Sequence, residues 1–319
     1  MADNINFISE TEVNEEELLE RFLTDTIMPL VKEDNRQKEV FRSRFWGYLW
    51  SACFLLGANT LIILFRYLMY GYVINYEQLF LVCLLALAVV VWPLYQYHII
   101  SRQSLFDEFL KFYGNYWQQA EYNADLPSKA PIIPPHENYT TVHGIVGNYD
   151  SVQIFMYDMI FAKMQRIQKF NFKRMVSSGV MIKIKFSKSF NKKTYLFDES
   201  GFYRKNSYTG LENITENVHI PAANYFKIFA EDESYAKDLL PSMFFERVLD
   251  MKDTFRAKHL YIQIEDDFML MYLENASLYF ENSGLWHKSI DKENFFVLHR
   301  KIQNTIEAVQ IIQAMKEQI

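Results

Sequence analysis

The stretch WGYLWSACFLLGANTLIILF, residues 46–65, decides the fold of this chain, because it contains no Asp, Glu, Lys, Arg or His. A second uncharged stretch, LFLVCLLALAVVVWPLYQY, covers residues 79–97. At about 1.5 Å per residue, each stretch would reach about 30 Å as a helix, which is the thickness of the hydrocarbon core of a bilayer. The sequence therefore predicts two transmembrane helices that form a hairpin over residues 46–98.

The basic residues beside these stretches predict the orientation of the hairpin. Arg36, Lys38, Arg42 and Arg44 precede the first stretch, and Arg102 and Lys111 follow the second. The connecting loop has Arg66 as its single basic residue. Because Lys and Arg accumulate on the cytoplasmic side of a membrane, both termini are expected in the cytoplasm. Both cysteines, Cys53 and Cys83, fall within the predicted spans, so no disulfide framework holds the rest of the chain together.

Two flanking segments surround the hairpin. Residues 1–45 are expected to form an acidic amphipathic helix that starts near Asn14, is broken or kinked at Pro29, and is followed by the basic juxtamembrane segment. Residues 99–138 are expected to form a juxtamembrane helix, with apolar positions from Leu105 to Trp117, and then a linker rich in proline.

Residues 139–319 are expected to form one α+β domain. Short segments with alternating or apolar patterns predict strands, mainly antiparallel, at 152–157, 182–187, 195–197, 260–264, 268–273 and 277–281. Helical spacing predicts a helix over 234–252, interrupted at Pro241, and a long C-terminal helix over 291–315 that covers the sheet. This order of elements suggests a pleckstrin-homology-like arrangement by analogy.

A basic run is the strongest compositional signal in this domain. Between Lys163 and Lys205 twelve Lys and Arg residues are opposed by two acids, Asp198 and Glu199, whereas the whole chain has a net charge of −6. We expect a lipid or partner contact at these positions: Lys183, Lys185, Lys188, Lys192, Lys193, Arg204 and Lys205. Anionic lipid headgroups attract such residues beside a membrane. The alternative is a solvated sheet face whose lysines protect its edge from aggregation.

No catalytic, metal or cofactor signature accompanies this run. The acidic triplet Glu265, Asp266 and Asp267 is typical of a turn between two strands. The seven histidines are scattered, with no pair at i, i+4, so the sequence does not support a zinc site. Phosphate-binding and nucleophile-elbow motifs do not occur, and the acidic remainder of the chain argues against nucleic acid. We therefore expect a protein that is not an enzyme and binds no cofactor.

Five segments of the chain resemble an uncharacterised bacterial membrane protein family, domain of unknown function 3137. They are TIMPLVKEDNR, HGIVGNYDSVQI, SSGVMIKIKFSKSF, YAKDLLPSMFFERVL and LYIQIEDDFMLMYL, with Gly144, Gly179 and Pro241 as their firmest positions. The resemblance implies a multi-pass protein of the bacterial inner membrane with a cytoplasmic domain. It implies no activity, ligand or catalytic residue.

These observations favour a membrane-anchored cytoplasmic binding or scaffolding module that contacts anionic lipid or a protein partner at the inner-membrane surface. One alternative is an accessory subunit of an oligomeric membrane assembly or transport system, in which the hairpin forms a homo-oligomer. An enzyme with an unrecognised site and a secreted effector anchored in a host membrane are further alternatives.

Overall fold

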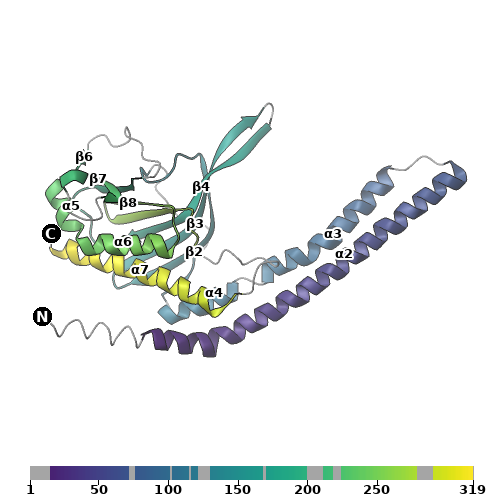
Figure 1. Ribbon diagram of the computed structural model, residues 1–319, viewed down its shortest axis with the longest axis horizontal. Coiled ribbons are helices and arrows are strands. Elements are labelled where there is room, and N and C mark those ends of the chain that lie inside the picture. Colours follow the sequence, from purple (N-terminus) through teal and green to yellow (C-terminus); the bar gives the residue numbers. More distant parts are fainter. Residues whose placement is uncertain are drawn as a thin grey trace. The chain divides into compact units, whose positions relative to one another are not determined.

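The computed structural model describes residues 15–71, 76–100, 103–114, 116–120, 130–167, 170–199, 211–217, 224–278 and 290–318 (Figure 1). Contacts within the chain divide it into two compact units. Unit 1 comprises Met1–Phe112 and Asn282–Lys292, and unit 2 comprises Tyr113–Glu281 and Glu293–Ile319. The second unit thus begins at Tyr113, whereas the sequence places the start of the soluble domain at residue 139.

Unit 1 is helical. A helix that is described from Glu15 onward passes through a π-helical turn, η1 (Leu23–Ile27), into α2 (Met28–Tyr70). Gly71 ends α2 with a φ of 65°, a conformation that glycine adopts without steric cost. The helix α3 (Tyr76–Ile100) then returns alongside α2, and α4 (Gln103–Leu110) and the 3₁₀ turn η2 (Lys111–Tyr113) follow (Figure 1).

The predicted break at Pro29 is wrong, because the helix continues through this residue. Proline has no backbone N–H, and its ring clashes with the carbonyl group four residues earlier in a regular α-helix. Here the π-helical turn directly precedes it, and the N–H of Met28 donates to the carbonyl oxygen of Leu23, five residues back. The wider turn displaces the carbonyl groups that would otherwise meet the proline ring, so the helix stays continuous.

One helix among the described residues, 15–69, is long and apolar enough to cross a membrane. Only 6% of its most apolar window is buried, which differs from the core helix of a soluble protein. In α3 the apolar helix formed by the described side chains, Phe80–Trp92, is shorter than a bilayer crossing requires. The structure therefore supports one span rather than the expected pair, and the span at 79–97 stays a prediction.

Unit 2 is built on an antiparallel sheet of nine strands, which confirms the expected α+β class. The strands are β1 (Gln118–Gln119), β2 (Asn138–Tyr149), β3 (Val152–Ile167), β4 (Phe170–Lys185), β5 (Thr194–Asp198), β6 (Glu212–Asn213), β7 (Phe226–Ala230), β8 (His259–Glu265) and β9 (Phe268–Glu274). Their order is β1-β2-β3-β4-β9-β8-β5-β7-β6, so the β8–β9 hairpin lies between β4 and β5. The pleckstrin-homology-like arrangement stays an analogy.

Three helices belong to this unit: α5 (Glu233–Leu239), α6 (Ser242–Thr254) and α7 (Lys292–Gln318). The predicted interruption at Pro241 and the predicted C-terminal helix are both confirmed. Figure 1 shows α6 and α7 side by side against the sheet, and Arg247 of α6 forms an ion pair with Glu307 of α7 at 2.6 Å. Buried residues such as Val248 and Ile302 fill the core beneath them.

A second apolar cluster contains mostly aromatic side chains. Phe161, Phe197, Tyr261 and Tyr272 are fully buried in it, together with Ile132 and Ile133 of the proline-rich segment. The described part of this segment is therefore packed into the core of unit 2. Burial of its two isoleucines is favourable because it removes their apolar surface from water.

The strand boundaries differ from the predicted ones in several places. The segment 152–157 falls within β3, and 182–187 overlaps the end of β4 and passes it by two residues; both strands begin or end far beyond these segments, and β2 was not predicted. The predicted helix through Trp117 ends early, because α4 stops at Leu110 and Gly114 takes a φ of 94°. Of the strand candidate 277–281, the first two residues form no strand, and the rest lies outside the described residues.

Candidate functional site

The predicted basic residues lie at the end of β4 and in the connection to β5. Lys183 and Lys185 belong to β4, Lys188 and Lys192 are exposed in the connection, and Lys193 directly precedes β5. Arg204 and Lys205 lie outside the described residues.

Two of these lysines meet the acidic turn between β8 and β9. Lys185 Nζ lies 3.8 Å from a carboxylate oxygen of Asp267, and Lys193 Nζ lies 3.4 Å from one of Glu265. Lys183 is half-buried within the sheet, opposite Leu270 of β9. The predicted surface is thus partly neutralised by its own domain, and Lys188 and Lys192 are its exposed, described members outside these two ion pairs.

The acidic turn does more than connect two strands. Glu265 accepts hydrogen bonds from the Tyr195 hydroxyl group at 2.6 Å and from the Gln263 side chain at 2.7 Å. Burial, together with this hydrogen bond to a carboxylate, raises the pKa of Tyr195 well above its usual value. This role could not be predicted, since Tyr195 and Glu265 are seventy residues apart along the chain.

A different basic element projects from the sheet. Beyond Ala162, β3 and β4 pair only with each other, from Ala162–Met175 to Ile167–Phe170. The register shifts between Phe161 and Ala162, so that Val176 is an extra residue in β4. Such a bulge bends and twists a ribbon. We call residues 162–176 the arm; Figure 1 shows it extending from the sheet, and five residue steps give it a reach of about 17 Å.

The arm exposes apolar and basic side chains together. Phe172 and Met175 are 52% and 62% exposed, and Met164 and Val176 are exposed as well. Its sequence contains five Lys or Arg residues and no Asp or Glu. Lys163 lies directly opposite Arg174 in the strand register, an arrangement of like charges that destabilises a ribbon. Among the described residues, no ion pair joins Lys163, Lys173 or Arg174 to a carboxylate.

The sequence pointed to this element only indirectly. The arm residues belong to the basic run, but the residues selected as the site lie C-terminal to it. The usable signal was the absence of acids from Met159 to Phe197, together with Phe and Met residues placed between the cations. It was missed because alternation, the usual mark of a strand, is lost where both faces of a ribbon are exposed.

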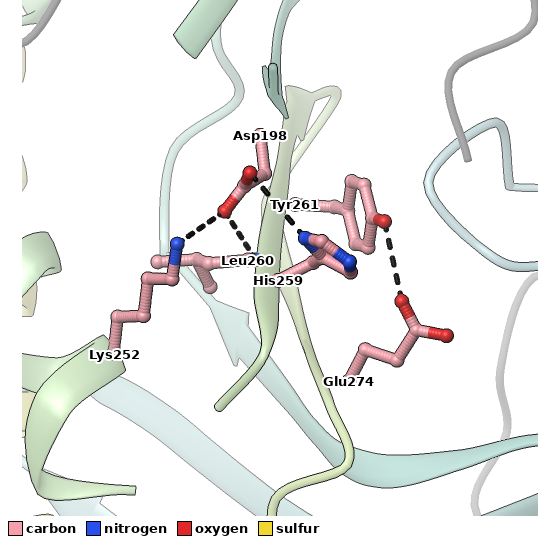
Figure 2. A network of polar contacts seen from close by, with 6 residues as sticks. All are labelled: Asp198, Lys252, His259, Leu260, Tyr261 and Glu274. Carbon is pink, nitrogen blue, oxygen red and sulfur yellow. Dashed lines mark hydrogen bonds and ion pairs between the residues drawn. The ribbon is translucent and has the colours of Figure 1, made fainter. Parts of the chain in front are cut away.

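A buried polar network lies at the end of the sheet opposite the acidic turn (Figure 2). Asp198, which is 4% exposed at the end of β5, accepts from Lys252 Nζ of α6 at 2.5 Å. The backbone N–H of Leu260 donates to the same oxygen, Oδ2, at 3.4 Å, and His259 Nδ1 lies 3.4 Å from the other oxygen, Oδ1. Nearby, Tyr261 donates to Glu274 at 3.3 Å (Figure 2). The ion pair between Asp198 of β5 and Lys252 of α6 therefore links α6 to the sheet.

Glu274 connects this network to β4. The hydroxyl group of Ser177 donates to Glu274 at 3.1 Å and lies 2.5 Å from the hydroxyl oxygen of Tyr272. Burial raises the pKa of Tyr272 above its usual range. In the described part of the chain, no group of three or more His, Cys, Asp or Glu side chains is placed to hold a metal ion.

This chain is similar to a solved structure and to a family model, each over part of its length. No curated protein matches this chain. A solved crystal structure, that of the mycobacterial trehalose monomycolate transport factor A, TtfA, is similar at 8% identity and a TM-score of 0.38. The match covers 65% of this chain and 93% of that one. A likeness at this level carries no inference about function. A family model matches the C-terminal part of the chain. The first two of the five quoted segments and nearly all of the arm lie outside the matched residues. Residues 176–316 match the family described as Protein of unknown function (DUF3137), which confirms the resemblance over these residues.

Proposed function

We propose that this chain is a membrane-anchored binding and scaffolding module, without catalytic activity, that works at the cytoplasmic surface of the bacterial inner membrane. The observation that carries this proposal is the apolar exterior of α2. Trp50, Phe54 and Leu68 are each more than 70% exposed, and many of their neighbours in the helix are also apolar. A continuous apolar surface of this size is unfavourable in water and favourable in the hydrocarbon core of a bilayer.

The hairpin geometry supports a second crossing within this proposal. The helix α3 has 25 residues, which corresponds to about 37 Å at about 1.5 Å per residue. Its described outer side chains, such as Phe80, Leu84 and Leu87, are exposed and apolar. With two crossings, the basic residues that flank the hairpin place both termini in the cytoplasm and the short loop after α2 on the opposite side.

Unit 2 would then be held beside the cytoplasmic leaflet. Asp198, Glu265 and Glu274 are engaged by partners within the domain. No ion pair of the described residues involves the cations Lys163, Lys173 and Arg174 of the arm, or Lys188 and Lys192 of the connection from β4 to β5. These features support binding of an anionic lipid or protein surface. The alternative, an accessory subunit of an oligomeric assembly, stays a prediction from the sequence.

The two native cysteines provide the test. Cys53 lies in α2 and Cys83 in α3, and both are exposed in the structure. If both helices cross the bilayer, a membrane-impermeant maleimide leaves both thiols unlabelled in sealed and in opened vesicles, and labels them after denaturation in detergent. The chain also stays with the membrane after alkaline extraction.

Two control variants in a background of Cys53→Ala and Cys83→Ala report the side. Met69→Cys, near the end of α2, is labelled from outside intact cells, whereas Met243→Cys on α6 is labelled only after the cells are opened. Labelling of Cys83 in opened vesicles would reject the second span. Release of the chain by alkaline extraction would reject the anchor itself.

A further inference from the structure

We infer that the arm, and not the predicted segment from Lys183 to Lys193, is the element that binds the anionic leaflet, by inserting its exposed apolar side chains among the lipid headgroups. This inference rests on the proposed function, because it assumes that unit 2 is held close to a bilayer.

The shape of the arm is the first argument. A two-stranded ribbon without further partners is marginally stable in water, and here both of its outer edges lack a neighbouring strand. Domains that only need to protect a sheet edge use short, charged edge strands. The arm is instead long, and its reach of about 17 Å exceeds the depth of about 5–10 Å to which interfacial segments enter a membrane.

The side chains of the arm indicate which kind of partner it binds. Phe172, Met164 and Met175 supply apolar surface that a solvated ribbon does not need. The cations Lys163, Lys173 and Arg174 accompany this apolar surface. A soluble anion would satisfy the cations and leave the apolar side chains in water, whereas an anionic bilayer satisfies both.

The opposed pair of Lys163 and Arg174 is the third argument. These residues face each other across the ribbon, where like charges repel. An anionic partner placed between or beside them relieves this repulsion. The predicted segment differs, because Lys185 and Lys193 already contact Asp267 and Glu265 of their own domain.

The experiment uses the full chain reconstituted in nanodiscs. Cys53 and Cys83 are replaced by alanine, and Phe172→Cys carries an environment-sensitive nitrobenzoxadiazole label. One set of discs contains phosphatidylcholine alone, and the other contains an equal mixture with anionic phosphatidylglycerol. The inference expects a blue-shifted emission and protection from iodide quenching in the anionic discs only. The same label at Met243→Cys on α6 stays accessible to water in both.

Two double variants, each of which removes two positive charges, show whether the arm or the predicted segment binds the bilayer. Lys173→Gln with Arg174→Gln lowers the equilibrium between inserted and free arm about thirtyfold, since each cation near an anionic surface contributes about a factor of five. The double variant Lys188→Gln with Lys192→Gln, which removes two other exposed cations, changes the equilibrium between inserted and free arm by less than about twofold. The reverse ranking overturns the inference in favour of the predicted segment.

The remaining outcomes are also decisive. Equal insertion into neutral discs, or no insertion into anionic ones, overturns the inference; shielding of the label by an added oligonucleotide but not by lipid also overturns it. If the chain fails to enter discs at all, the membrane anchor fails. The labelled chain is then mixed with preformed anionic vesicles, and a blue shift there still supports the arm while its absence rejects it.

Discussion

The Nζ atom of Lys252 lies 2.5 Å from the carboxylate of Asp198, which joins the last turns of α6 to the end of β5. Only 5% of the Asp198 side chain and 22% of the Lys252 side chain are exposed. The charge of each group is therefore tolerated in the interior only because the other is present.

We expect Asp198→Asn to lower the free energy of unfolding by about 2–4 kcal/mol, because it leaves the ammonium group of Lys252 without its counter-ion. The measurement is a urea titration of the purified chain, followed by the circular dichroism signal of the sheet. Lys227→Gln is the control, since Lys227 and Glu199 form a more distant and more exposed pair at 3.9 Å. Equal effects of the two variants would contradict the role assigned to Asp198.

Glu265 is expected to contribute more than its neighbour Asp267. Glu265→Ala removes the acceptor of the buried Tyr195 hydroxyl group and should cost about 1–3 kcal/mol. Asp267→Asn removes only a long, exposed contact with Lys185 and should cost less than about 0.5 kcal/mol. Thermal unfolding of both variants, compared under the same buffer, checks this order.

His299 predicts how stability depends on pH. Its Nδ1 atom lies 2.6 Å from the hydroxyl oxygen of Tyr113, and burial lowers its pKa to about 4. The unfolded chain, with an imidazole pKa of about 6.5, takes up the proton first as the pH falls. Stability is therefore complete above about pH 6.5 and is lost between about 6.5 and 4, by about 2 kcal/mol at pH 5.

The variant His299→Gln should remove this part of the slope, whereas His136→Gln should retain it. Urea midpoints at pH 7, 6 and 5 provide the measurement. An unchanged slope in His299→Gln would mean that another group titrates.

Gly179 is expected to tolerate no side chain. A Cβ atom at this position would lie 2.1 Å from the carbonyl oxygen of Leu273 in the neighbouring strand β9. Gly179→Ala must therefore push β4 away from β9, and we expect a loss of at least about 2 kcal/mol. Gly47→Ala, where the added Cβ meets nothing within 4 Å, should be neutral or slightly stabilising. Comparison of the two unfolding curves tests the prediction.

Elements whose character is set by local pattern could be predicted from the sequence. The helices around Pro241 and the C-terminal helix have periodic apolar positions, because one side of each faces a core. The strand near Ile182 alternates, whereas the strand near Ile262 is buried on both sides and was recognisable as a short apolar run. Two of the glycines that carried the family resemblance also have a local reason. Gly179 lies against the backbone of β9, and Gly144 lies against the ring of Tyr157.

Features that depend on distant partners could not be predicted. The lysines at 185 and 193 gave a basic pattern, but only the strand register brings them to the acidic turn at 265–267. The arm lost its pattern because both of its faces are exposed. Pro29 indicated a break, yet the π-helical turn before it depends on backbone geometry that no residue type announces.

The position of the β8–β9 hairpin determines the order in which the protein can be completed during synthesis. The strands β1–β4 and β5–β7 leave the ribosome first, but their inner edges stay open until residues 259–274 arrive to fill the gap. The apolar helix at 15–69 emerges long before that moment. If this helix enters the bilayer during synthesis, the strands β1–β4 and β5–β7 stay unpaired with each other at the membrane surface until β8 and β9 are made. Open strand edges of this kind pair with strands of other chains. Final folding is then slow, because it requires contacts between residues far apart in the chain.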